Sequence, residues 1–191
     1  MEDVLKLKVY HGTDFEIAQK ICTEGFMCKT NLEHWLGNGI YFYSDKPLAK
    51  WWTTNPSKKF GTQIKNPVVI ECDLEVNEKN VLDITKIEGY NNYVEIFHYY
   101  FENYYFKIPP VLETDIRRVR CVFFNWLMET QGIDVIIAPF QLTKQPYRKE
   151  SNKRNLEDLI LNEFEISYVE VQVCLKPDKQ HLLSNKRIER I

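Results

Sequence analysis

Three segments of the sequence alternate apolar and polar residues, and they constrain the fold more than any other feature. They are residues 5–10 (Leu-Lys-Leu-Lys-Val-Tyr), 67–75 and 166–176. A period of two places successive side chains on opposite faces of a strand, so we expect three half-buried β-strands. Two apolar or aromatic runs, 39–43 and 133–138, are expected to be further strands.

Helical patterns lie between these segments, so we predict a mixed α+β fold. Thr13 and Glu16 have the spacing of a capping box, which predicts that a helix starts there. Ala18 and Ile21 lie on its expected apolar face, and Gly25 is placed to end it. Further helices are expected at residues 45–53, 90–106, 114–131 and 156–162.

Length and composition favour one cytoplasmic domain spanning residues 1–191. The chain has 191 residues and a net charge of −2, so no global field attracts nucleic acid. No apolar stretch of about 18 residues is present, and the N-terminus does not resemble a signal peptide. The five cysteines are odd in number and widely spaced, which favours reduced structural thiols over a zinc site. We expect no metal and no membrane partner.

Three short motifs carry the candidate chemistry. Tyr10-His11-Gly12-Thr13 lies at a strand-to-helix junction, and Gly39-Ile40-Tyr41-Phe42 begins an aromatic strand. The strand at 166–176 places Glu170 and Gln172 two residues apart, on one face. In this order, the motifs resemble those of the ADP-ribosyltransferase superfamily. The likeness is to the branch with a His-Tyr-Glu triad, which includes diphtheria toxin and the poly(ADP-ribose) polymerases, and it covers about a third of the chain.

The resemblance implies a fold and a set of binding residues. The expected fold has two packed, mostly antiparallel sheets flanked by helices around an NAD cleft. His11 would hydrogen-bond a ribose hydroxyl, and the backbone of Gly12 would bind the nicotinamide carboxamide, with Thr13 completing the motif. Tyr41 would stack on the nicotinamide, and Trp52 occupies the place of the second stacking aromatic residue.

The sequence departs from the family pattern at two places. Ala49 stands where the polymerases have a serine that binds the carboxamide. The catalytic position is open between Glu170 and Gln172. A carboxylate would stabilise the oxocarbenium-like transition state of nicotinamide–ribose cleavage, whereas an amide can orient a hydroxyl but carries no charge.

These features predict an NAD-dependent mono-ADP-ribosyltransferase that uses NAD as a substrate and, by analogy, a toxin, effector or defence factor. The alternatives are an NAD glycohydrolase, a non-catalytic module that binds ADP-ribose or nucleic acid, and an unrelated interaction protein. A relative of the RNA 2′-phosphotransferases fits less well, because the basic residues are not near the motifs. The acceptor is open between protein and nucleic acid. Nucleic acid is slightly preferred because of a basic cluster formed by Lys144, Arg148, Lys149, Lys153 and Arg154.

Overall fold

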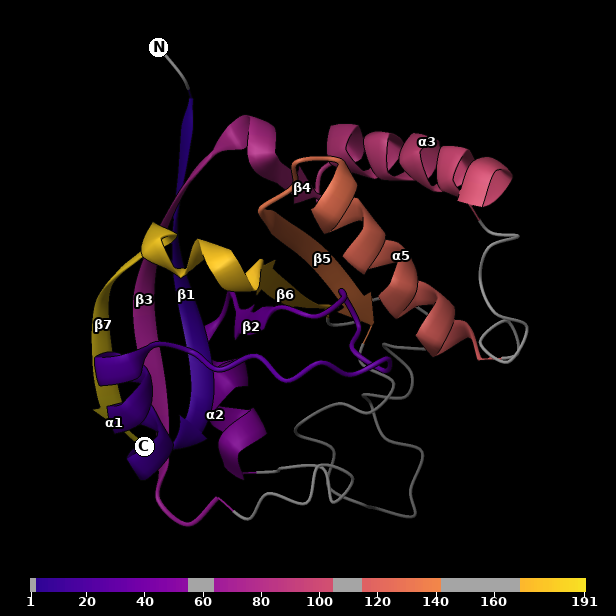
Figure 1. Cartoon of the computed structure of the whole chain (residues 1–191). Helices are drawn as coiled ribbons and strands as arrows, with labels where there is room; N and C mark the ends of the chain where they lie inside the picture. The colour runs from indigo at the N-terminus through magenta and orange to yellow at the C-terminus, as the bar shows by residue number, and fades with distance from the viewer. Residues whose placement is uncertain (1–2, 55–63, 105–114, 142–168) are drawn as a thin grey trace, which may run out of the picture.

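The protein has an α+β fold, which confirms the predicted class, and the computed structural model describes residues 3–54, 64–104, 115–141 and 169–191 (Figure 1). Two short 3-10 helices, Glu78–Asn80 and Pro177–Leu182, each lie between two consecutive strands. The elements in chain order are β1 (Val4–Asp14), α1 (Phe15–Glu24), β2 (Ile40–Tyr43), α2 (Lys46–Thr54), β3 (Pro67–Asn77), β4 (Val81–Asp83), α3 (Ile87–Tyr104), α5 (Ile116–Thr130), β5 (Val135–Gln141), β6 (Val169–Leu175) and β7 (Leu183–Arg190).

The strands form one mixed sheet, so the expected pair of packed sheets is wrong. The order across the sheet is β4-β5-β6-β2-β1-β3-β7. β4 and β5 run parallel, and the other neighbouring strands run antiparallel. β2 joins what would otherwise be two sheets, because it pairs with β6 along its length and with β1 at a single position, Tyr10 opposite Tyr43. β1 pairs with β3 over all eleven of its residues.

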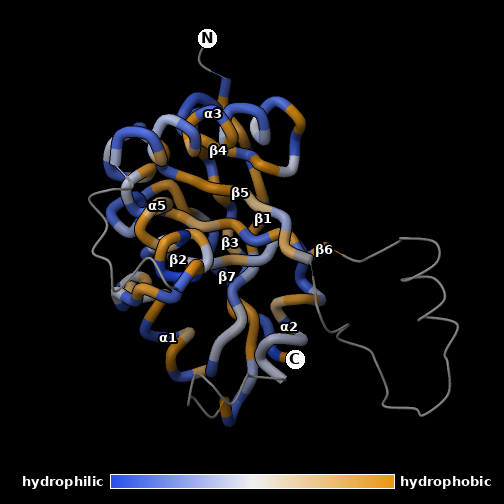
Figure 2. The backbone as a smooth tube through the Cα atoms, turned by 90° about the vertical axis from the view of Figure 1, so that its right-hand side faces the viewer, coloured by the Kyte–Doolittle hydropathy of each residue, from blue (hydrophilic) through white to orange (hydrophobic). Residues whose placement is uncertain are grey.

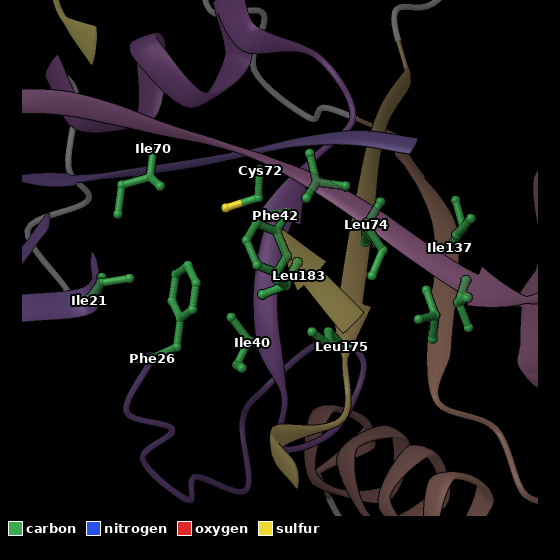
Figure 3. Packing of buried hydrophobic residues seen from close by; sticks show 14 of the residues in the cluster. Ile21, Phe26, Ile40, Phe42, Ile70, Cys72, Leu74, Ile137, Leu175 and Leu183 are labelled. Atoms are coloured by element: carbon green, nitrogen blue, oxygen red, sulfur yellow. The ribbon is translucent and has the colours of Figure 1, made fainter. Parts of the chain in front are cut away.

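Two apolar clusters lie on opposite faces of the sheet. The first is formed by α1, the loop that follows it and one face of the central strands (Figure 3). The second packs α5 and part of α3 onto the other face near β5 and β6. Figure 2 shows the apolar stretches of the tube running through the strands and the inner sides of these helices. Buried members of the first cluster include Val9, Ala18, Ile21, Phe26, Phe42 and Ile70, and those of the second include Leu36, Phe123, Leu127, Ile136 and Cys174.

The first helix begins one residue later than the capping box predicts. Thr13 is buried and belongs to β1, and Asp14 caps α1 by accepting a hydrogen bond from the amide of Glu16 at 3.1 Å. The other oxygen of Asp14 accepts the amides of Lys65 and Asn66 at 2.9 Å, so this cap also joins the end of β1 to the segment before β3. Gly25, with φ of 90°, ends α1 as predicted.

The last strand of the chain was missed. The segment 166–176 was predicted as the final strand, but β7 follows β6 and pairs with β3 at the edge of the sheet. The predicted helix at 156–162 and residues 166–168 lie outside the described residues.

Candidate functional site

The candidate site is the place where β1 and β2 part. Just beyond the two ends of β1, Phe15 N donates to Asn66 O and Glu78 N donates to Asp3 O, each at 2.9 Å, in the same register as the β1–β3 pairing. In β1 it is therefore the odd-numbered residues whose backbone groups bond to β3. Successive residues of a strand turn their N–H and C=O groups to opposite sides. The backbone groups of Gly12 therefore turn away from β3, towards the side on which β2 has diverged.

His11 is held at this opening by a main-chain contact. Its Nδ1 lies 2.8 Å from the carbonyl oxygen of Tyr41, and its ring makes edge contacts with Phe26 and Phe42 at centroid distances of 5.2 and 5.9 Å. A carbonyl oxygen can only accept, so Nδ1 carries a proton. Burial lowers the pKa of His11, against the opposing effect of the Tyr41 carbonyl. The neutral ring consequently leaves Nε2 as a hydrogen-bond acceptor.

Tyr41 lies on the opposite face of β2 from His11. Its hydroxyl accepts from the amide of Leu36 and donates to the carbonyl of Gly37, each at 2.7 Å. Burial is the main cause of the raised pKa of Tyr41, so the phenol stays protonated. The ring of His34 makes an edge contact with it at 5.7 Å. His11 and Tyr41 are therefore brought together through the main chain of β2 and not by contact of their side chains.

Helix α2 packs against β1 at Gly12, beside the opening. A Cβ at Gly12 would lie 2.4 Å from the carbonyl oxygen of Ala49 and 2.5 Å from Cγ2 of Thr53. Glycine at this position is thus required for strand-to-helix packing, a role that sequence reasoning did not anticipate. Trp52, on the same helix, is half-buried. Among the described residues, no aromatic ring pairs with it.

Glu170 and Gln172 share one face of β6, as predicted, and contact each other. Gln172 lies opposite Tyr43 of β2, and its Nε2 donates to Oε1 of Glu170 at 2.5 Å. The Glu170 residue is only 4% exposed, and burial raises the pKa of its carboxyl group. Burial and the charge of Glu170 also raise the pKa of Tyr43. The two candidate residues therefore form one hydrogen-bonded pair, with the carboxyl group in the more buried position.

One of these neighbours, Tyr43, could have been found from the sequence. Tyr43 follows Tyr41 by two residues in the same strand, so an alternating pattern places it on the same face. The five basic residues predicted to contact the acceptor, Lys144, Arg148, Lys149, Lys153 and Arg154, lie outside the described residues.

In the described part of the chain, no group of three or more histidine, cysteine, aspartate or glutamate residues is arranged to hold a metal ion. The five cysteines are free thiols. None of the described helices is both long enough and apolar enough to cross a membrane.

Comparison with known proteins identifies one relative of unassigned activity. An uncharacterized protein of Methanocaldococcus jannaschii is 25% identical over 190 residues, which cover 92% of this chain and 85% of that protein. No family model matches the sequence. No solved structure matches it. The chain is thus similar, over nearly its whole length, to an archaeal protein whose name states no function.

Proposed function

We propose that the protein is an NAD-dependent mono-ADP-ribosyltransferase whose cleft is the opening between β1 and β2. The observation that carries the proposal is the single pairing of these strands at Tyr10 and Tyr43, after which the backbone of Gly12 turns towards the opening. A peptide N–H and C=O side by side match the C=O and NH₂ of a carboxamide. The resemblance to the ADP-ribosyltransferases likewise implies that the backbone of Gly12 binds the nicotinamide carboxamide.

The state of His11 supports a role in binding a ribose. With Nδ1 committed to the Tyr41 carbonyl and the ring neutral, Nε2 can accept a hydrogen bond from a hydroxyl group. No described residue donates to Nε2. A fixed acceptor beside an amide-binding backbone suits a nucleoside, and it needs no reorganisation when the substrate enters.

The charge of Glu170 supports the chemical step. When the bond between nicotinamide nitrogen and ribose C1′ breaks, the electron pair leaves with nicotinamide and positive charge develops on the sugar. A carboxylate in a buried site stabilises such a charge more than it would in water. Gln172 donates to Glu170 and holds its orientation. We therefore assign the catalytic carboxylate to Glu170 and a positioning role to Gln172.

The uncharged side chain of Gln172 favours the transfer of a single ADP-ribose. In our proposal the acceptor attacks C1′, forms the new bond and releases its proton to solvent. Gln172 can orient a hydroxyl but cannot accept a proton from it at neutral pH. This is our reason for preferring transfer of one ADP-ribose over polymer growth. With water as the acceptor, the same step is NAD hydrolysis.

Release of nicotinamide from labelled NAD⁺ tests the proposal. Glu170→Gln keeps the shape and removes the charge, so turnover should fall by about 100-fold or more while NAD⁺ affinity changes little. Glu75→Gln is the matched control, because Glu75 is exposed on β3 and paired with Lys6. Absence of nicotinamide release by the wild type, or equal turnover in the two variants, contradicts the proposal.

Trp52→Ala separates binding from chemistry. If Trp52 stacks on the substrate, its loss should weaken NAD⁺ binding by about five- to tenfold or more. Trp51→Ala, on the neighbouring residue of α2, is the control. Isothermal titration with NAD⁺ measures both variants, and equal affinities would remove Trp52 from the site.

A further inference from the structure

A half-buried arginine near the proposed site has no carboxylate partner in the part of the chain that the structure describes. Arg120 is in the second turn of α5, and its guanidinium carbon lies 5.4 Å from the centroid of the Trp35 ring. Its Nε is inaccessible to solvent and has no hydrogen-bond partner within residues 3–54, 64–104, 115–141 and 169–191. In the described residues no ion pair involves Arg120, whereas Arg117, one turn earlier, pairs with Asp115 and Glu33. A partly desolvated guanidinium without an anion is unfavourable, so the position suits an external anionic group.

This arginine is connected to the catalytic pair through two aromatic rings. The Trp35 ring contacts that of Phe140 at a centroid distance of 4.7 Å. Phe140 lies directly opposite Glu170 in the β5–β6 pairing, and residues so placed have Cβ atoms about 5 Å apart on one face. Tyr41 also lies close enough to influence the pKa of Arg120, which burial lowers. Arg120, Trp35 and Phe140 are called the Arg120 subsite below.

The Arg120 subsite lies across β2 from His11. His11 packs against Phe26 and Phe42, whereas Phe140 and Tyr41 pack against the apolar cluster on the other face of the sheet. In the proposed function the adenosine half of NAD⁺ lies with His11. Arg120 thus lies across β2 from the adenosine half and beside the catalytic pair, where a second substrate must approach the reacting ribose.

We propose that the Arg120 subsite binds a backbone phosphate of a single-stranded nucleic acid, which is the acceptor of ADP-ribose. This inference rests on the proposed function. The planar guanidinium matches two phosphate oxygens. Trp35 is 41% exposed, and an exposed ring beside a cation is the combination by which proteins bind single strands without reading sequence. The nucleophile is a base nitrogen or a hydroxyl oxygen, which bonds to C1′ as the bond to nicotinamide breaks and whose proton passes to solvent.

Fluorescence anisotropy with a short, mixed-sequence single-stranded DNA tests the binding step. Arg120→Met should weaken binding by about tenfold or more, since a charge-assisted hydrogen bond is lost. It should also lower the slope of log K against log salt by about 0.7, the value for one phosphate contact on a single strand. Arg117→Met removes the same charge from the same helix and should leave the slope unchanged. Arg120→Lys keeps the charge without the planar guanidinium, so its DNA affinity should lie between that of Arg120→Met and that of the wild type.

Nicotinamide release in the absence of DNA separates this inference from the function on which it rests. It should be unchanged in Arg120→Met, which also shows that the variant is folded. Equal losses of DNA affinity in the Arg120 and Arg117 variants overturn the inference. So does transfer of ADP-ribose to protein side chains with none to the oligonucleotide, while nicotinamide release persists. If the wild type releases no nicotinamide, the proposed function fails, and the anisotropy data then report DNA binding alone.

Discussion

The two edges of β1 differ, although one strand forms both. Its edge towards β3 is closed along all eleven residues, whereas its edge towards β2 pairs only at Tyr10 and Tyr43. Val9 and Ile70 are fully buried beside the closed edge, which serves stability. Polar groups without a complete set of partners among the described residues lie at the open edge, including the backbone of Gly12 and the imidazole of His11. One strand can thus carry the fold on one side and a binding site on the other.

The largest effect is expected from damage to the core beside the closed edge. Ile70 is fully buried in the first apolar cluster. Ile70→Ala should lower the free energy of unfolding by about 3–4 kcal/mol, from lost burial and a cavity. Urea denaturation measures the change. A loss below about 1 kcal/mol would mean that this edge is not the stable part of the molecule.

The second effect concerns the packing of α2 over the open edge. Gly12→Ala places a methyl group against backbone atoms of Ala49, so we expect a loss of about 1–3 kcal/mol and displacement of α2. Gly132→Ala is a useful control, because its φ of 68° brings backbone strain without any contact within 4 Å. Urea denaturation should rank Gly12→Ala as more harmful. Equal losses of stability in the two variants would mean that the close approach of α2 does not determine the need for glycine at position 12.

A smaller effect is expected from the hydroxyl that joins β2 to the preceding loop. Tyr41→Phe leaves the ring in place but removes the bonds to Leu36 and Gly37. We expect a loss of about 1–2 kcal/mol in stability, because the amide of Leu36 and the carbonyl of Gly37 each lose a hydrogen-bond partner. NAD⁺ affinity should change little if the ring face is what binds. A large loss of affinity with unchanged stability would instead assign the hydroxyl to the ligand.

The smallest effect is a gain in stability from removing the buried charge. The pKa of Glu170 is raised in the folded protein, so the unfolded chain loses this proton more readily. Ionisation therefore costs stability above the folded-state pKa, and the cost disappears as the pH falls below the unfolded value near 4.5. Glu170→Gln should melt slightly higher than the wild type at pH 7, with the difference shrinking on acidification. A variant that melts lower at pH 7 would show that the carboxylate is stabilising.

The strands and helices could largely be predicted, because their patterns are local. The alternation at 5–10 and 67–75 identified β1 and β3, and Gly25 marked the end of α1. β7 was missed because Leu-Ser-Asn-Lys-Arg-Ile-Glu-Arg contains only two apolar residues. The single sheet could not be predicted, since it depends on one long-range pairing between Tyr10 and Tyr43.

The candidate site was predicted only where a motif carries it. His11, Tyr41 and Glu170 are candidates because of the motifs and their order. The contact of His11 with the Tyr41 carbonyl, and the bond between Gln172 and Glu170, depend on how the strands diverge and pair. Arg120 has no motif at all. It stands out only because it lies beside Trp35 with a buried Nε that no described residue accepts from.

Amide hydrogen exchange at Gly12, with and without NAD⁺, tests most directly whether the open edge of β1 binds the dinucleotide. Thr13 is the internal reference, because its amide turns to β3 by the same alternation. With NAD⁺ at about 100 times its Kd, we expect exchange at Gly12 to slow by up to about 100-fold, and by more than at Thr13. Equal slowing at the two amides, or none at Gly12 while NAD⁺ is bound, would contradict the account.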